Sequence, residues 1–391
     1  MVDQSAFMSA APHFFEEPAA VPAPAFAVIH GSGVEQRLAE AEALTRDNDH
    51  IAALAQLDAL WPDLQEDAPL ALRHRLAAAW ARMYLGELDN ATALLAKADS
   101  IVQSPHFDAA DRAAVLYRTG CVALKRTEVA EAISLFTRAL ETNVRSARPS
   151  SLLAADIRNW RSRCYQVGRD WDAAARDAEA SLDLATEAGC ERTRAHAMFQ
   201  ASLVAERQRQ WLLARFHAEQ ALEIYRQYGD TLSTARILNN LGGIDFLLGD
   251  IQGAEQALEE AAATATAAGS DADVAQATSS LAQVLLRTDR PAEARDHALT
   301  ALALLTGRVD FLAEIGNAQL VVAKSHSAEF DAPSASIWLD HAERTFVELN
   351  STSHLAAVAI ARGDLARETG DSDGAAELYR HAAEALQDFH F

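Results

Sequence analysis

Cysteine is scarce in this sequence. The chain has three cysteines, Cys121, Cys164 and Cys190, and no two of them form a CxxC pair. An odd number of cysteines without that spacing excludes a disulfide framework and lacks the pattern of a zinc site. We therefore interpret the three side chains as ordinary buried thiols of a protein in a reducing cytoplasm.

Positive charge is also in short supply. Lysine and arginine number 34 against 56 aspartates and glutamates, so the formal net charge is −22. This balance argues against binding to duplex nucleic acid or to an anionic membrane surface, because both depend on cationic side chains. The first basic residue is Arg37, so no signal peptide is expected. Apolar runs such as Leu76–Trp80 are far shorter than the ~20 residues that span a bilayer, so we expect a soluble, cytoplasmic protein.

Catalytic motifs are missing as well. The 13 histidines form no HExxH or HxH pair, and no nucleophile elbow is visible. Gly31-Ser32-Gly33 is not followed by the Gly-Lys-Ser/Thr of a phosphate-binding loop, so we interpret it as a linker. The sequence therefore predicts a protein that is not an enzyme and needs no cofactor or metal.

What the chain does contain is an internal repeat with a period of about 40 residues. Nine similar segments each contain an alanine at the same place, and we call these the column alanines: Ala53, Ala91, Ala132, Ala174, Ala214, Ala254, Ala294, Ala335 and Ala375. Positions −12 and +7 relative to each column alanine also hold Ala, Gly or Ser, with Leu60 as the one exception. Small residues at fixed intervals allow two helices to approach closely. Larger residues at position +4, such as Phe136 and Leu258, would fill the space between these crossings.

The residues between the segments predict tight turns. Gly86, Gly249 and Gly370 stand five positions before column alanines, where a glycine would end a first helix in the left-handed conformation. The next position is acidic in seven of the nine repeats, which suits the start of a second helix. Each unit therefore reads as helix, turn, helix, and the fold class is predicted to be all-α.

These residues carry a family resemblance. The segment Ile237–Ala261, ILNNLGGIDFLLGDIQGAEQALEEA, resembles a tetratricopeptide repeat, although the period is about 40 residues instead of the usual 34. We attribute the extra residues to longer second helices or longer connections. Lengthened repeats of this kind resemble those of peptide-responsive quorum-sensing regulators and of the sensor halves of actinobacterial helix-turn-helix regulators. No helix-turn-helix pattern precedes the repeats. The resemblance implies a right-handed superhelix, an α-solenoid of about nine helical hairpins, over residues 35–391.

The resemblance also implies a binding surface. In such superhelices the concave face is lined by first-helix residues 18, 15, 11, 8 and 7 positions before the column alanine. On 35 such positions bases outnumber acids seven to two, so we expect a relatively basic groove inside an acidic shell. The predicted groove residues are Asn159, Arg163, His196, Phe199, Arg236, Asn239, Phe246, Gln283, Arg287 and Lys324. Each of these residues could instead stabilise the fold. The cations could pair with acids of neighbouring repeats, and the two phenylalanines could belong to the core.

We expect a regulatory or adaptor protein that binds a peptide or protein partner with acidic or carboxylate groups, with a signalling-peptide sensor linked to transcriptional regulation as one form of it. The alternative is a scaffold that assembles an enzyme or secretion complex through its acidic outer surface. Residues 1–34, rich in proline and alanine, are interpreted as a disordered tail, with a docking motif or an autoinhibitory segment as the other options. The sequence does not settle the oligomeric state, for which a homodimer is one option.

Overall fold

A computed structural model of the chain describes residues 33–46, 48–308 and 311–387. The segment interpreted as a tail lies outside the described residues except for Gly33 and Val34, which begin the first helix. All regular structure in the described part of the chain is helical, which confirms the predicted fold class.

The chain divides into two compact units at Tyr228 and Gly229. The N-terminal unit contains α1 (Gly33–Arg46), α2 (His50–Leu64), α3 (Ala68–Tyr84), α4 (Leu88–Val102), α5 (Ala109–Lys125), α6 (Val129–Val144), α7 (Ser151–Val167), α8 (Trp171–Glu187), α9 (Glu191–Arg207) and α10 (Trp211–Tyr228). The C-terminal unit contains α11 (Thr231–Leu248), α12 (Ile251–Ala267), α13 (Asp271–Arg287), α14 (Pro291–Leu304), α15 (Leu312–Ala328), α16 (Ala332–Glu348), α17 (Thr352–Glu368) and α18 (Ser372–Gln387).

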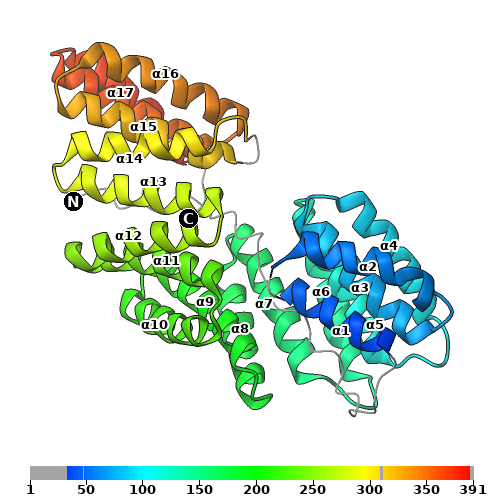
Figure 1. The fold of residues 1–391 in the computed structure, drawn as a ribbon. Helices are drawn as coiled ribbons and strands as arrows, with labels where there is room; N and C mark the ends of the chain where they lie inside the picture. The colour runs from blue at the N-terminus through cyan, green and yellow to red at the C-terminus, as the bar shows by residue number, and fades with distance from the viewer. Residues whose placement is uncertain (1–32, 47, 309–310, 388–391) are drawn as a thin grey trace. The chain divides into compact units, whose positions relative to one another are not determined.

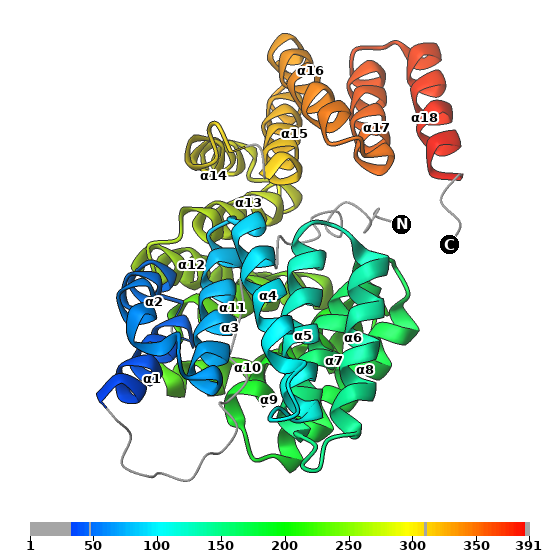
Figure 2. The same cartoon turned by 90° about the vertical axis from the view of Figure 1, so that its right-hand side faces the viewer.

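Successive helices pair as antiparallel hairpins, and the hairpins stack side by side within each unit (Figures 1 and 2). The first helices of neighbouring hairpins also touch, as α3 touches α5 and α13 touches α15. Within each unit, the first helices therefore form one layer of stacked hairpins. The described helices make nine hairpins, as the repeat predicts.

The lengthened period has its origin in the helices. In the repeat that starts at α11, the first helix has 18 residues and the second, α12, has 17 residues. Only Gly249 and Asp250 separate these two helices, and the connection from α12 to α13 is nearly as short. The residues that exceed the usual repeat therefore lengthen the helices and not the connections.

Small residues face large ones across the hairpins. A Cβ atom added at Gly242, on α11, would lie 2.5 Å from Cγ of Leu258 on α12 and 3.2 Å from the backbone oxygen of Ala254. Gly120 stands in the same relation to Phe136, and Gly363 to Tyr379. Each glycine occupies position −12 and each large residue position +4 relative to a column alanine, so the structure confirms the predicted helix crossings.

The hairpin turns share one backbone conformation. The residue five positions before the column alanine has a positive φ in all nine repeats, although only three are glycines: Asn48, Gly86, Thr127, Arg169, Arg209, Gly249, Asp289, Phe330 and Gly370. The following residue caps the second helix where it is aspartate; for example, the Asp250 carboxylate accepts from the Gly253 amide at 2.9 Å. Glu87 and Glu128 make no such bond, so the predicted acidic preference is a capping function that aspartate performs.

Phe330 is the least favourable of these turn residues. Its φ is 62°, and its side chain is 91% exposed. The left-handed conformation costs a residue with a Cβ roughly 1–2 kcal/mol, and glycine avoids this cost but adds about 0.5–1 kcal/mol of unfolded-state entropy. Phe330→Gly is therefore expected to raise the free energy of unfolding by up to about 1 kcal/mol, measured as a higher urea midpoint. Phe330→Ala keeps a Cβ and serves as the control; an equal gain in both variants would contradict this explanation.

Two chemical features are not found in the described part of the chain. None of its helices combines the length and the apolar character required to cross a bilayer. No three histidine, cysteine, aspartate or glutamate side chains within it are grouped to hold a metal ion.

Candidate functional site

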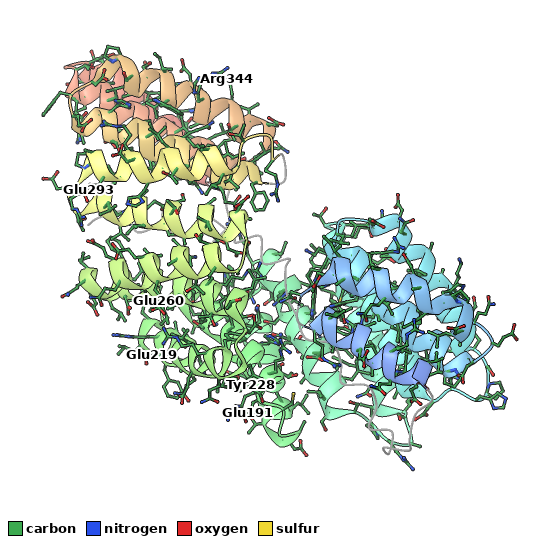
Figure 3. The ribbon with its side chains drawn as sticks, viewed as in Figure 1. Glu191, Glu219, Tyr228, Glu260, Glu293 and Arg344 are labelled. Atoms are coloured by element: carbon green, nitrogen blue, oxygen red, sulfur yellow. The ribbon has the colours of Figure 1, made fainter. Side chains whose placement is uncertain are left out.

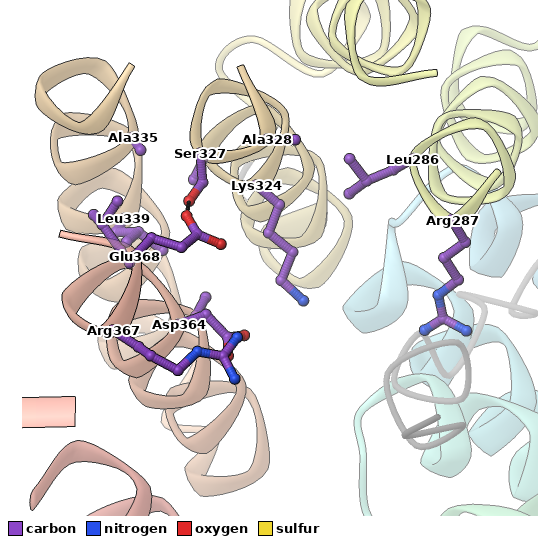
Figure 4. A pocket seen from close by; sticks show the side chains of 13 residues that line it. Leu286, Arg287, Lys324, Ser327, Ala328, Ala335, Leu339, Asp364, Arg367 and Glu368 are labelled. Atoms are coloured by element: carbon purple, nitrogen blue, oxygen red, sulfur yellow. Dashed lines mark hydrogen bonds and ion pairs between the residues drawn. The ribbon is translucent and has the colours of Figure 1, made fainter. Parts of the chain in front are cut away.

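The C-terminal unit contains a cavity of about 330 Å³ between first helices (Figure 4). The lining residues are Leu286 and Arg287 on α13, Ala323, Lys324, Ser327 and Ala328 on α15, Ala335 and Leu339 on α16, and Ala361, Asp364, Leu365, Arg367 and Glu368 on α17. Eight of these thirteen residues stand 11, 8 or 7 positions before a column alanine. Residues at these three repeat positions therefore line a hollow in this unit.

The cavity contains two of the predicted site residues, Arg287 and Lys324. Figure 4 shows both side chains extending into the space from α13 and α15. The Arg287 Cζ atom also lies 5.7 Å from the centre of the Phe246 ring, so a third predicted residue borders the same region. Gln283 is half-buried one turn earlier on α13.

Acidic side chains on α17 complete the lining. The Ser327 hydroxyl donates to Oε2 of Glu368 at 2.5 Å, and the Tyr379 hydroxyl donates to Oδ1 of Asp364 at 2.8 Å. Arg367 lies 3.5 Å from the same Asp364 oxygen. Three cations and two carboxylates thus line the cavity, an excess of one positive charge. The residues on α17 were absent from the predicted site, although the same repeat positions in the ninth repeat would have identified them.

Arg236 has a different environment. Its Nε and Nη2 atoms donate to the two oxygens of Asp273 at 2.8 and 3.0 Å, and the two side chains are 6% and 9% exposed. The Ser270 hydroxyl donates to the same carboxylate at 2.5 Å. This bidentate pair joins α11 to α13, so the guanidinium predicted to hold a ligand is engaged in holding two repeats together.

Two predicted asparagines have an unsatisfied acceptor. Asn159 on α7 and Asn239 on α11 occupy the same repeat position, and the Oδ1 atom of each is buried without a hydrogen-bond partner in the described structure. A buried acceptor left unpaired costs about 1–3 kcal/mol. Within the described residues, neither oxygen therefore has a donor to offset the cost of its burial.

The remaining predicted residues lie in the interior of the N-terminal unit. Arg163, His196 and Phe199 are 8%, 1% and 2% exposed. The Arg163 guanidinium carbon lies 4.9 Å from the centre of the Trp160 ring. With the Gln200 amide turned so that its oxygen faces Arg163, that oxygen accepts hydrogen bonds from Nε and Nη2 at 3.2 Å. Aromatic packing therefore surrounds these three side chains. They are buried, whereas the cavity cations Arg287 and Lys324 are only half-buried.

Burial changes the protonation of two groups on these helices. It lowers the pKa of His196 well below 6.5, assisted by the nearby charges of Arg192 and Arg163, so the imidazole is neutral at pH 7. It raises the pKa of Asp156 to about 8 against the opposing charge of Arg118. Asp156, one of the two acids on the mapped positions, is thus mostly uncharged at neutral pH.

Comparison with known proteins identifies the repeat. Residues 233–306 match the family model described as tetratricopeptide repeat. No sequence among characterised proteins matches the chain significantly. A Rap protein complexed with competence and sporulation factor has a similar fold, with a TM-score of 0.63 and 19% identity over 91% of this chain and 98% of that one.

Two further solved structures are similar. The apo form of the quorum sensor NprR from B. thuringiensis has a TM-score of 0.67 and 12% identity, over 90% of this chain and 98% of that one. Aspartyl phosphate phosphatase F from Bacillus subtilis has a TM-score of 0.58 and 15% identity, over 93% of this chain and 97% of that one. At these identities the likeness establishes the fold.

Proposed function

We propose that this tetratricopeptide-repeat protein is a non-enzymatic regulator or adaptor that binds an extended peptide segment at its first helices. The observation that carries the proposal is the cavity between α13, α15 and α17, where Arg287 and Lys324 extend from neighbouring repeats toward one space. Their charge favours a carboxylate of the partner, and Leu286, Leu339 and Leu365 provide apolar surface beside it.

Asn239 supports a peptide as the ligand. An extended peptide presents backbone N–H groups, and Asn239, on α11 of the unit that contains the cavity, has a buried oxygen that lacks a donor in the described structure. The solved Rap protein is complexed with a competence and sporulation factor, and NprR is a quorum sensor. By analogy with these proteins of similar fold, the proposed ligand is a signalling peptide or the peptide tail of a partner protein.

Charge reversal at the cavity tests the proposal. The variant Arg287→Glu/Lys324→Glu is expected to lose the partner that wild-type protein retains from host lysate, with bound species identified by mass spectrometry. For an ionic contact removed from a partly enclosed site, we expect an affinity loss of about 2–5 kcal/mol with the purified partner. The matched control, Lys97→Glu/Arg344→Glu, reverses two charges at exposed positions of α4 and α16 outside the cavity. Figure 3 labels Arg344.

The outcome separates binding in the cavity from scaffolding on the outer surface. If the cavity variant keeps every partner, the cavity proposal fails and the acidic outer surface becomes the better candidate. Arg236 is unsuitable for this test because a glutamate there would face Asp273 in a buried site and destabilise the fold. Since a phosphatase shares the fold, hydrolysis of acetyl phosphate above the uncatalysed rate would contradict the non-enzymatic part of the proposal.

A further inference from the structure

Helix α10 exposes an apolar patch on its outer side. Leu212, Leu213 and Phe216 are 74%, 44% and 54% exposed. Residues three and four positions apart lie on one face of a helix, so the three side chains are contiguous. We call them the α10 patch. Burying such side chains is worth about 1.5–3 kcal/mol each, so a patch left in water is a candidate contact surface.

The repeat architecture does not require this patch. Its residues stand two and one positions before, and two positions after, the column alanine Ala214. At the same three positions of the other eight repeats, large aliphatic or aromatic side chains occur only at Ile51 and Ile337. If stacking of hairpins demanded apolar residues there, the other repeats would have them too. Hairpin packing therefore does not account for the α10 patch.

The charges that flank the patch are complementary to each other. Arg209 is exposed in the turn before α10. Glu219, which Figure 3 labels, follows the patch one turn later, and its side chain is 54% exposed. When two copies of α10 pack antiparallel about a two-fold axis at the level of Ala214, Leu212 lies opposite Phe216 of the second copy. In the same arrangement Arg209 lies opposite Glu219 of the second copy. A two-fold contact requires a surface that is complementary to itself, and this order of basic, apolar and acidic side chains provides one.

From this self-complementarity we propose that the α10 patch is the contact surface of a two-fold homodimer, with Arg209 and Glu219 pairing across it. The proposal is independent of the ligand cavity, which lies on other helices. Three apolar side chains from each copy make a small interface, and the net charge of −22 on each copy opposes association. The dimer is therefore weak, and it forms in the micromolar range at physiological salt.

Sedimentation velocity of the purified full chain tests the contact. Between about 1 and 500 μM, a range chosen for a small interface, the wild-type mass is expected to rise from that of one copy toward that of two. Phe216→Glu is expected to raise the dissociation constant at least about tenfold, because it places a charge in the apolar centre of the contact. Val144→Glu, at an exposed apolar position of α6, is the control and leaves the constant unchanged. Circular dichroism checks that both variants stay folded.

A charge swap provides the sharper test. Arg209→Glu and Glu219→Arg are each expected to weaken the dimer, and the double variant Arg209→Glu/Glu219→Arg is expected to restore it, since both copies then carry the exchanged pair. Glu219 also pairs with Arg215 on its own helix at 3.0 Å, so the recovery in the double variant is the specific signal. A wild-type chain that stays monomeric over the whole range would overturn the proposal. A dimer that Phe216→Glu leaves unchanged would overturn it as well.

Discussion

Asp273→Ala is expected to lower the free energy of unfolding by about 3–5 kcal/mol. The substitution leaves the Arg236 guanidinium buried between α11 and α13 without the carboxylate that accepts its two hydrogen bonds. Urea unfolding of the full chain, followed by circular dichroism, measures the loss. Asp340→Ala is the control: Asp340 pairs with Arg362 at 2.6 Å, but its side chain is 57% exposed, so its loss is expected to stay below about 1 kcal/mol.

A second variant separates the cost of the unpaired Arg236 charge from the cost of lost packing around Asp273. Arg236→Met/Asp273→Ala removes both charges, and it is expected to be more stable than Asp273→Ala because no unpaired ion remains buried. If the double variant is as unstable as the single one, the loss comes from packing around Asp273 and not from the uncompensated arginine.

Phe346→Ala is expected to cost about 3–5 kcal/mol, the range for truncating a fully buried aromatic side chain. Phe346 on α16 is 0% exposed and packs directly on Gly316 of α15, where an added Cβ would lie 2.6 Å from the ring atom Cζ. For the same reason Gly316→Val alone is expected to cost about 1–3 kcal/mol by overpacking.

The two changes are expected to compensate in part. With the ring removed, the valine side chain occupies space that Phe346 vacated, so Gly316→Val/Phe346→Ala should lose at least about 1 kcal/mol less than the sum of the single losses. Urea unfolding of the wild type, the two single variants and the double variant gives the four stabilities of this double-mutant cycle. Additive losses would show that the two positions do not share the space that the structure assigns to them.

The helix crossings were predictable because they recur. The small residue at Gly242 and the large one at Leu258 belong to columns that repeat through the chain, and a repeated pattern reports a contact that every hairpin must make. Gly316 shows the limit of this reasoning. It stands outside the three columns, and only the packed position of Phe346 reveals why a side chain has no room there.

The repeat position of a residue did not predict whether its side chain would be open to a ligand. Lys324 and Arg236 both stand at predicted face positions, 11 and 18 residues before their column alanines, yet one lines a cavity and the other is buried against Asp273 in the next repeat. A repeat position specifies the face of a helix, but the side chains of the next hairpin decide whether that face is open or covered. The unpaired oxygen of Asn159 likewise follows from its neighbours and has no signal of its own in the sequence.

The sequence by itself determined the all-α class, the nine hairpins, the turns at positive φ that contain glycine, and the face that first helices present to one another. These features depend on residues within one repeat or between adjacent ones, so their period is visible in a single chain. The tertiary structure decided which cations pair internally, where a cavity remains, and that the α10 patch stays in water. Those outcomes depend on contacts between side chains of different repeats, for which the period specifies the place but not the partner.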